Sequence, residues 1–185
     1  MLVTVARAAG ERLTAQRAVA LLASLVLGGL AVFMLWPGPR LPESAKADSV
    51  IVLKGQRRLL LLYGGETLKA YTVALGSEPH GHKFREGDGR TPEGTYRLDA
   101  RNPRSRFHLA LHISYPNESD RARAIAAGAS PGGDIMIHGL PNGLGWIGKL
   151  HRFVDWTDGC IAVTNREMEE ILRAVYDGTP IEIRP

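Results

Sequence analysis

The feature that most constrains the fold is a run of nineteen uncharged residues, AVALLASLVLGGLAVFMLW, from Ala18 to Trp36. A helix of that length covers about 30 Å, the thickness of a bilayer's hydrocarbon core. Three arginines and a single glutamate precede the run, so the positive-inside rule keeps residues 1–17 in the cytoplasm. The sequence predicts a single-pass transmembrane signal-anchor at 18–36, with the rest of the chain in the periplasm or another extracytoplasmic space.

A cleaved signal peptide is the competing interpretation, because it also combines a basic start with an apolar core. The run is longer than a usual signal core, and the residues after it, Trp36-Pro37-Gly38-Pro39, lack a small-x-small cleavage site. These observations favour an uncleaved anchor. Residues 37–47 are rich in proline and small or polar residues, so we expect a short, semi-extended linker before a domain at 48–185.

Length, charge and cysteine content limit the class of protein further. The chain has 185 residues and a net charge of +4, which suits one domain plus accessory segments. Its single cysteine excludes an intramolecular disulfide. Its arginines are scattered rather than aligned along a helix with aromatic residues, so we expect no nucleic-acid partner.

Residues 48–185 read mainly as strands separated by turns. Three β-rich runs with short glycine turns between them, 49–54, 57–63 and 67–75, predict an antiparallel meander. Further strands are expected at 95–98, 107–115, 135–138 and 181–183, and short helices at 118–127 and at 165–175. Thr164 and Glu167 form a capping box for the last helix. The class is mostly β with α additions, a β-sandwich or partly closed barrel.

The candidate nucleophile is the only cysteine, Cys160, in the turn Trp156-Thr157-Asp158-Gly159-Cys160. Gly159 allows the backbone to approach a bound carbonyl and leaves N–H groups to stabilise an oxyanion. Upstream, a short apolar strand ends in His138-Gly139 and delivers an imidazole that could generate the thiolate. A buried, inert cysteine and a structural histidine are the alternative interpretation.

A long polar loop, residues 76–94, precedes the segment Arg90-Thr91-Pro92-Glu93-Gly94. Loops of this length in a compact domain are usually functional. Pairs of histidines at 80/82 and 108/112 raise the possibility of a metal hydrolase. No His-Glu-x-x-His helix or partner carboxylate motif accompanies them, so we expect neither a metal nor a cofactor.

The chain resembles the catalytic domain of the L,D-transpeptidases, the YkuD family, in the order and spacing of four features. These are the meander, the Gly-Asp-x-Arg-Thr-Pro-Glu-Gly-x-Tyr segment, the Ile-His-Gly strand end and the Gly-Cys-Ile motif. The resemblance covers about residues 48–185. It implies a cysteine enzyme of cell-wall biogenesis that acts on peptidoglycan stem peptides. It also implies that carbapenem β-lactams acylate the family's cysteine, here Cys160.

In the family, the cysteine attacks the carbonyl of the third stem residue, expels the terminal D-alanine and forms a thioester. An amine then resolves the thioester, giving a 3→3 cross-link or attachment to an acceptor such as a lipoprotein lysine. The resemblance makes Cys160 the nucleophile, His138 the general base and acid, and the backbone at Gly159 and Cys160 the oxyanion donor.

The chain departs from the commonest family motif, Ser-His-Gly-Cys-x-Arg or Ser-His-Gly-Cys-x-Asn. Asp158 replaces the motif histidine, and Ala162 occupies the position that binds a substrate carboxylate in many members. Arg90, Arg152 or Arg166 could supply that cation. A carboxylate facing the thiol would raise its pKa, so we expect Asp158 to point away.

His151 is a second candidate histidine, ranked below His138 because a loop places a base less accurately than a strand end. The predicted substrate-binding set is Gly139, His151, Asp158, Thr157 and Arg90. The same sequence is compatible with two other functions. One is an L,D-carboxypeptidase or endopeptidase with water as acceptor, and the other is a non-catalytic module that anchors the membrane to the wall. In the second case Cys160 would be dispensable.

Overall fold

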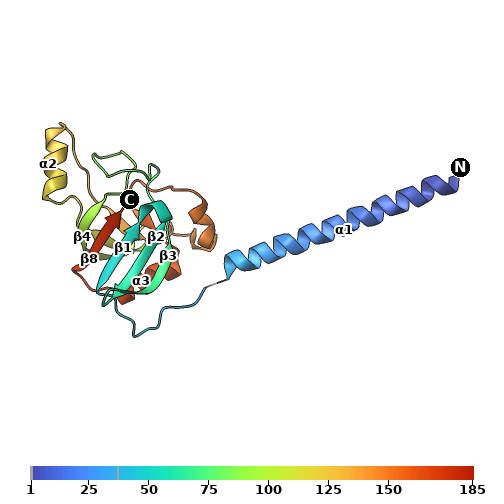
Figure 1. The fold of residues 1–185 in the computed structure, drawn as a ribbon, viewed down its shortest axis with the longest axis horizontal. Coiled ribbons are helices and arrows are strands. Elements are labelled where there is room, and N and C mark those ends of the chain that lie inside the picture. Colours follow the sequence, from blue (N-terminus) through green and yellow to red (C-terminus); the bar gives the residue numbers. More distant parts are fainter. Residues whose placement is uncertain (1, 37) are drawn as a thin grey trace. The chain divides into compact units, whose positions relative to one another are not determined.

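The computed structural model describes residues 2–36 and 38–185, with the side chains of 16–32, 36 and 38–185. It contains two compact units, Met1–Gly38 and Pro39–Pro185. The first consists of helix α1 (Leu2–Leu35), which also takes in most of the basic N-terminal segment (Figure 1). In the described part of the chain, no helix has the length and apolar character needed to cross a membrane. The predicted span includes residues 33–35, whose side chains lie outside that part.

The second unit is built on one eight-stranded sheet with the strand order β3-β2-β1-β8-β4-β5-β6-β7. The strands are β1 (Ser49–Leu53), β2 (Arg58–Tyr63), β3 (Glu66–Thr72), β4 (Gly94–Ser105), β5 (His108–Ile113), β6 (Met136–His138), β7 (Ile161–Ala162) and β8 (Thr179–Arg184). Figure 1 labels β1 to β4 and β8. The expected meander is confirmed, because β1 pairs antiparallel with β2 and β2 antiparallel with β3.

The last strand of the chain lies in the middle of the sheet. Strand β8 pairs parallel with β1 and antiparallel with β4. The last residues are therefore held between two early strands, and the meander is joined through β8 to the β4–β5 hairpin. At the other side, β6 pairs antiparallel with β5 and parallel with β7.

The two ends of the sheet meet. Beyond β3, Ala74 and Ala162 of β7 donate backbone hydrogen bonds to each other's carbonyls at 3.0 and 2.8 Å. Leu75, Gly76 and Ser77 continue the contact with Thr157. These bonds close the sheet on itself, so the partly closed barrel is the form of the fold that the chain adopts.

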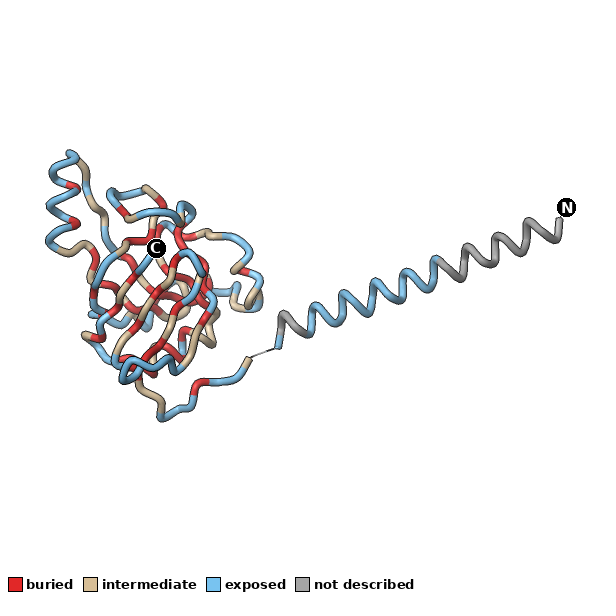
Figure 2. The backbone as a smooth tube through the Cα atoms, viewed as in Figure 1, coloured by how far each residue is buried: buried red, intermediate tan, exposed pale blue. Residues whose placement is uncertain are grey.

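The core lies inside this curved sheet, where the buried positions of Figure 2 are concentrated. Helix α3 (Asn165–Ala174) begins at the expected capping box, in which the Thr164 side chain accepts from the Glu167 N–H. Met168 and Ile171 on its inner face are fully buried. Helix α2 (Glu118–Ala126) also carries a capping box, but Ile125 on it is 74% exposed. Within α2 only Asp120 and Ala124 are buried.

The folded unit begins before residue 48. Leu41 is 4% exposed and Ala47 is 2% exposed, and both join the core. Lys69 Nζ and Arg173 Nη2 donate to the carbonyls of Pro39 and Leu41 at 2.8 and 3.0 Å. Much of the segment expected to be a linker is therefore bound to the domain.

Candidate active site

Cys160 occupies the last position of a tight turn that leads directly into β7. Thr157 organises this turn: its hydroxyl donates to the Cys160 carbonyl at 2.7 Å and accepts the Gly159 N–H at 3.2 Å. Thr157 is buried, with 5% of its surface exposed. Its hydroxyl is thus used inside the turn, whereas the sequence had suggested a substrate contact.

Gly159 is required by the backbone. It has φ +121°, which favours glycine, and a Cβ there would lie 2.5 Å from the Arg90 carbonyl oxygen. The turn therefore packs backbone to backbone against the end of the loop 76–93. Because the Gly159 N–H already bonds to Thr157, the Cys160 N–H becomes the candidate oxyanion donor.

The register of two strands relates Cys160 to His138. In the parallel pair β6–β7, Ile137 lies opposite Ile161 and His138 opposite Ala162. Ile137 and Ile161 are completely buried and face the core. Because side chains alternate along a strand, His138 and the residue preceding Ile161, Cys160, project from the opposite face. The two candidates therefore lie on the same face of the sheet, with Cys160 two residues before the register partner of His138, although they are far apart in sequence.

The backbone selects one tautomer of His138. Its Nδ1 lies 2.7 Å from the Gly139 carbonyl oxygen, which can only accept, so Nδ1 carries the proton. The other nitrogen, Nε2, is left as the basic one. The side chain is 3% exposed, and burial lowers its pKa below the usual value for histidine. A neutral imidazole is the resting form.

Two aromatic rings frame His138. The Phe107 ring lies 4.5 Å from the imidazole, centroid to centroid, with the planes tilted by 36°. The Trp156 ring meets it edge-on at 5.7 Å. These contacts restrict rotation of the ring and exclude water from it. Trp156 stands in the cysteine motif, but nothing in the sequence around Phe107, in the β4–β5 turn, indicated a role.

The surroundings of Cys160 favour the neutral thiol. Burial raises its pKa, and the nearby carboxylates of Asp158 and Asp134 raise it further. The Met136 N–H and the Lys83 ammonium act in the opposite direction. Asp158 is exposed, and the thiol donates to the Asp134 carbonyl at 3.6 Å. A proton acceptor at the site is therefore needed to generate the thiolate.

Lys83 is a cation near the thiol that the sequence did not single out. It is 3% exposed, and its ammonium donates to Asp88 at 2.8 Å and to the Arg85 carbonyl at 3.1 Å. No spacing rule distinguishes it from the other polar residues of the loop 76–93. The signal arises only when the loop folds back over the cysteine turn.

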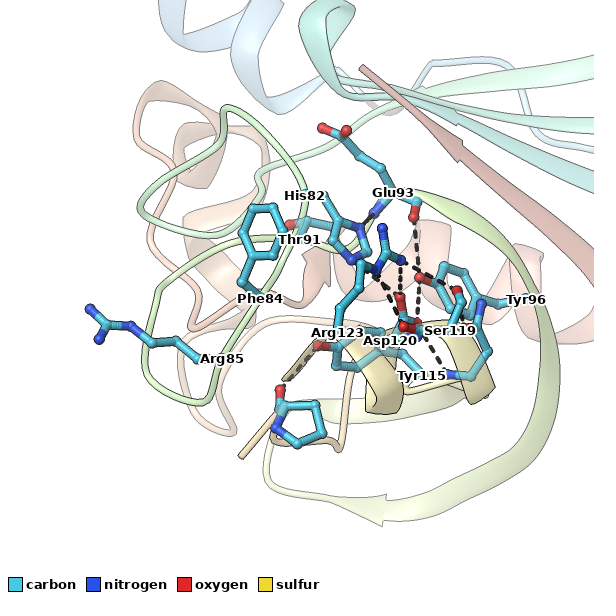
Figure 3. A network of polar contacts seen from close by, with 12 residues as sticks. His82, Phe84, Arg85, Thr91, Glu93, Tyr96, Tyr115, Ser119, Asp120 and Arg123 are labelled. Atoms are coloured by element: carbon cyan, nitrogen blue, oxygen red, sulfur yellow. Dashed lines mark hydrogen bonds and ion pairs between the residues drawn. The ribbon is translucent and has the colours of Figure 1, made fainter. Parts of the chain in front are cut away.

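A buried network around Asp120 anchors the same loop to α2 (Figure 3). Asp120 accepts from Tyr96 at 2.9 Å, from Arg123 at 2.6 Å and from His82 Nε2 at 3.2 Å. The Glu93 N–H donates to His82 Nδ1 at 3.0 Å, so Nε2 carries the proton. His82, suggested as a metal ligand, is thus a link between the loop and the helix.

Three arginines are candidates for the carboxylate-binding cation that this chain lacks at Ala162, and their surroundings differ. Arg152 is paired with Glu167. Arg166 lines a charged pocket that also contains Glu169 and Arg40. Arg90 belongs to the loop whose backbone contacts Gly159, and its guanidinium lies beside Gly81. By location, Arg90 remains the candidate for binding a substrate carboxylate.

The other histidines considered as ligands or bases contact residues close to them. His108 pairs with Glu169 at 2.9 Å and His112 with Asp99 at 2.6 Å. His151 is 8% exposed and lines an apolar pocket, and Gly139 packs against Asn165. Among residues whose side chains are described, no three metal-ligating groups gather in one place.

Comparison with known proteins identifies relatives of the chain. The chain is 31% identical over 112 residues to the Escherichia coli (strain K12) protein named "Putative L,D-transpeptidase YafK", a match covering 60% of this chain and 38% of that protein. The crystal structure of Pgp2, a helical cell shape determining protein from Campylobacter jejuni, superposes with a TM-score of 0.56 and 28% identity, over 73% of this chain and 46% of Pgp2.

The structure of Bd1075 from Bdellovibrio bacteriovorus shares the fold with a TM-score of 0.52 and 23% identity, over 77% of this chain and 49% of Bd1075. The chain thus spans less than half the length of these relatives. The family model of the L,D-transpeptidase catalytic domain matches residues 47–183, which include the turn, the histidine strand and the loop described above. The chain belongs to the YkuD family of L,D-transpeptidase catalytic domains.

Proposed function

We propose that this protein is an L,D-transpeptidase that transfers peptidoglycan stem peptides through a thioester on Cys160. The observation that carries the proposal is the strand register that sets Cys160 and His138 on one face, with His138 Nδ1 bonded to Gly139 and Nε2 left basic. This arrangement supplies the base from the end of β6 and the nucleophile from the turn that leads into the neighbouring strand β7.

Acylation begins with proton transfer from the Cys160 thiol to His138 Nε2. The thiolate attacks the carbonyl carbon of the third stem residue, forming a C–S bond, and the Cys160 N–H donates to the developing oxyanion. The C–N bond to the terminal D-alanine then breaks. Its amine takes the proton from the His138 imidazolium, which returns the imidazole to its neutral form.

Deacylation reverses these roles with a new amine. His138 accepts a proton from the acceptor amine as it attacks the thioester, a C–N bond forms and the C–S bond breaks. The thiolate of Cys160 recovers a proton from the imidazolium. The low basicity that burial gives His138 suits this step, because an imidazole that is neutral at pH 7 can accept the amine's proton.

The uncharged N-terminal run remains the basis for a proposed location. A helix through residues 18–36 would hold the catalytic unit at the outer surface of the cytoplasmic membrane, where its wall substrate lies. Extraction of membranes with alkaline carbonate tests this: the full chain should stay with the pellet. Release into the supernatant would contradict the anchor.

Mass spectrometry of tetrapeptide muropeptides incubated with the full chain tests the reaction. We expect dimers with a 3→3 linkage, absent with Cys160→Ala and with His138→Ala. His108→Ala is the matched control, because it removes an imidazole that is paired with Glu169. Tripeptides without dimers would move the assignment to a carboxypeptidase.

Labelling with a carbapenem gives a second readout that needs no acceptor. We expect the intact mass of the full chain to increase by one adduct, located on Cys160 and lost in Cys160→Ala. Failure of both labelling and turnover in the folded protein would leave the non-catalytic wall-binding module as the better explanation.

A further inference from the structure

The turn that joins β1 to β2 ends in a residue with an unfavourable backbone conformation. Arg57 follows the 3-10 segment Lys54–Gln56 and has φ +51° and ψ +45°, in the left-handed region. A side chain disfavours that region whereas glycine does not, so glycine is the usual residue at such a position. The strain at Arg57 indicates that its side chain has a role that glycine could not fill.

The Arg57 guanidinium binds the residue that precedes the cysteine turn. Its Nε and Nη2 lie 2.9 and 2.7 Å from Asp155 Oδ2, and its Nη1 donates to the Lys54 carbonyl at 2.9 Å. The other carboxylate oxygen, Asp155 Oδ1, accepts the Leu75 N–H at 2.8 Å. The two side chains of the ion pair are only 31% and 16% exposed, so solvent screens the pair less than it would on the open surface. Asp155 is thus held through both of its oxygens.

The ion pair is connected to the proposed catalytic groups through the next two residues of the chain. Trp156 directly follows Asp155, and its ring meets the His138 imidazole edge-on at 5.7 Å between centroids. Thr157 donates its N–H to the Leu75 carbonyl at 3.1 Å, and its hydroxyl organises the rest of the turn. A shift of Asp155 would therefore move both the ring beside the base and the start of the cysteine turn.

The β1–β2 turn that carries Arg57 is itself fixed by a buried lysine. Lys54 is 2% exposed, and its ammonium donates to the carbonyls of Gly81 and Thr91 at 2.5 and 2.9 Å and to Glu93 Oε1 at 2.8 Å. These bonds use all three hydrogens of the ammonium. The turn therefore gives the Arg57 side chain a rigid base from which to hold its partner.

The contacts of Lys54 lead to the other side of the cysteine turn. Thr91 follows Arg90, whose carbonyl oxygen packs against the backbone of Gly159. One short turn between two strands thus holds both neighbours of the cysteine turn. Arg57 holds the residue before it, and Lys54 holds the loop that packs against Gly159.

We propose that Arg57 is a positioning residue for the thioester chemistry. Through Asp155 it fixes where the cysteine turn begins, and it thereby aligns Cys160 with His138. The inference rests on the proposed function, because it concerns how fast Cys160 reacts once a substrate is bound. Loss of the guanidinium should therefore slow the reacting step and leave substrate binding almost unchanged.

Carbapenem labelling of the full chain at a series of concentrations separates these two effects. It gives the maximal labelling rate of Cys160 and the concentration that produces half of it. Arg57→Gly removes the guanidinium but adopts φ +51° without strain. We expect its maximal rate to fall about tenfold, because small displacements of a reacting group are costly, while the half-saturating concentration stays within about twofold of the parent. Arg57→Lys keeps a cation and should lie between the two.

Arg101→Ala is the matched control for loss of an arginine–aspartate pair. Arg101 Nε lies 2.6 Å from Asp177 Oδ1, and its other nitrogens donate to the carbonyls of Leu172 and Val175 at 2.7 and 2.6 Å, which fastens the end of α3. This variant should lower the urea midpoint at least as far as Arg57→Gly does, yet label at the parent's maximal rate. A similar loss of labelling in both variants, or none in Arg57→Gly, would overturn the proposal.

Asp155→Asn tests the route through which Arg57 acts. It leaves an oxygen for the Leu75 N–H but removes the charge that binds the guanidinium, so it should slow labelling as Arg57→Gly does. Because both variants break the same contact, the double variant should label no more slowly than either single one. Losses that add in the double variant would contradict a route through Asp155.

Hydrogen exchange of the unlabelled chain gives a readout that does not require an enzyme. The amides of residues 155–160 should exchange at least tenfold faster in Arg57→Gly and at the parent's rate in Arg101→Ala. Faster exchange in a protein that no carbapenem labels contradicts the enzyme but not the positioning of the turn. Normal labelling of the parent, with exchange and labelling both unchanged in Arg57→Gly, contradicts the positioning but not the enzyme.

Discussion

Replacing Gly159 with alanine tests whether the cysteine turn depends on close backbone packing. At φ +121° an alanine is strained by about 1–3 kcal/mol. Its Cβ would also lie 2.5 Å from the Arg90 carbonyl oxygen and 3.2 Å from Ile135 Cδ1. The oxygen belongs to the backbone and cannot rotate away, so the overpacking adds about 1–3 kcal/mol. We expect a total loss of about 4 kcal/mol in the free energy of unfolding.

Gly178→Ala is the matched control. Gly178 has φ +86°, but nothing lies within 4 Å of a Cβ built there, so the substitution adds only backbone strain, about 1–2 kcal/mol. Urea unfolding followed by circular dichroism measures both variants. With a slope of about 2 kcal/mol per molar urea, the midpoint should fall by about 2 M for Gly159→Ala and by less than about 1 M for Gly178→Ala.

Equal midpoints for the two alanine variants would refute the argument, because they would show that the Arg90 carbonyl yields without cost. Carbapenem labelling provides an independent check on the same contact. A turn pushed away from Arg90 displaces Cys160, so Gly159→Ala should label at least tenfold more slowly than the parent, whereas Gly178→Ala should label normally.

Four further predictions concern charge, stacking and capping. Burial raises the Cys160 pKa, so iodoacetamide should alkylate the thiol slowly at pH 7 and faster as the pH rises. The Asp158 carboxylate raises the same pKa, so Asp158→Asn should speed alkylation severalfold at fixed pH. Mass spectrometry measures the alkylated fraction in both cases. Burial lowers the His138 pKa and the base must be neutral, so the acid limb of the acylation rate should lie below pH 6.5; a limb above that value contradicts the assignment. Phe107→Leu should reduce kcat about tenfold at unchanged KM, and Phe107→Tyr should restore it. Thr164→Ala removes the α3 cap and should cost about 1 kcal/mol in urea unfolding.

Local patterns predicted the elements of the fold better than their order. Alternation and glycine turns gave the meander, and the capping box gave the start of α3 at Asn165. Nothing in the sequence indicated that β8 pairs with β1 and β4 in the middle of the sheet. Such pairing depends on which edges remain open after the rest of the chain has folded, and no short-range pattern records it.

The same distinction applies to the site. Cys160 and His138 could be proposed because each stands in a short motif with a glycine neighbour. Lys83 and Phe107 could not, because they reach the site only when a loop and a hairpin turn fold over it. Substrate binding by Thr157 and His151 stays a prediction; the structure adds that the Thr157 hydroxyl organises the turn and that the His151 imidazole lines an apolar pocket.

The seam between Ala74 and Ala162 has a consequence for when the protein becomes reactive. Strand β7 has only two residues, held by β6 on one side and by the end of the meander on the other. Contacts between such distant segments form late in folding, since they require long loops to close. In a newly made chain Cys160 and His138 are therefore not yet aligned, and the arrangement proposed for the nucleophile and its base arises only once the barrel is complete.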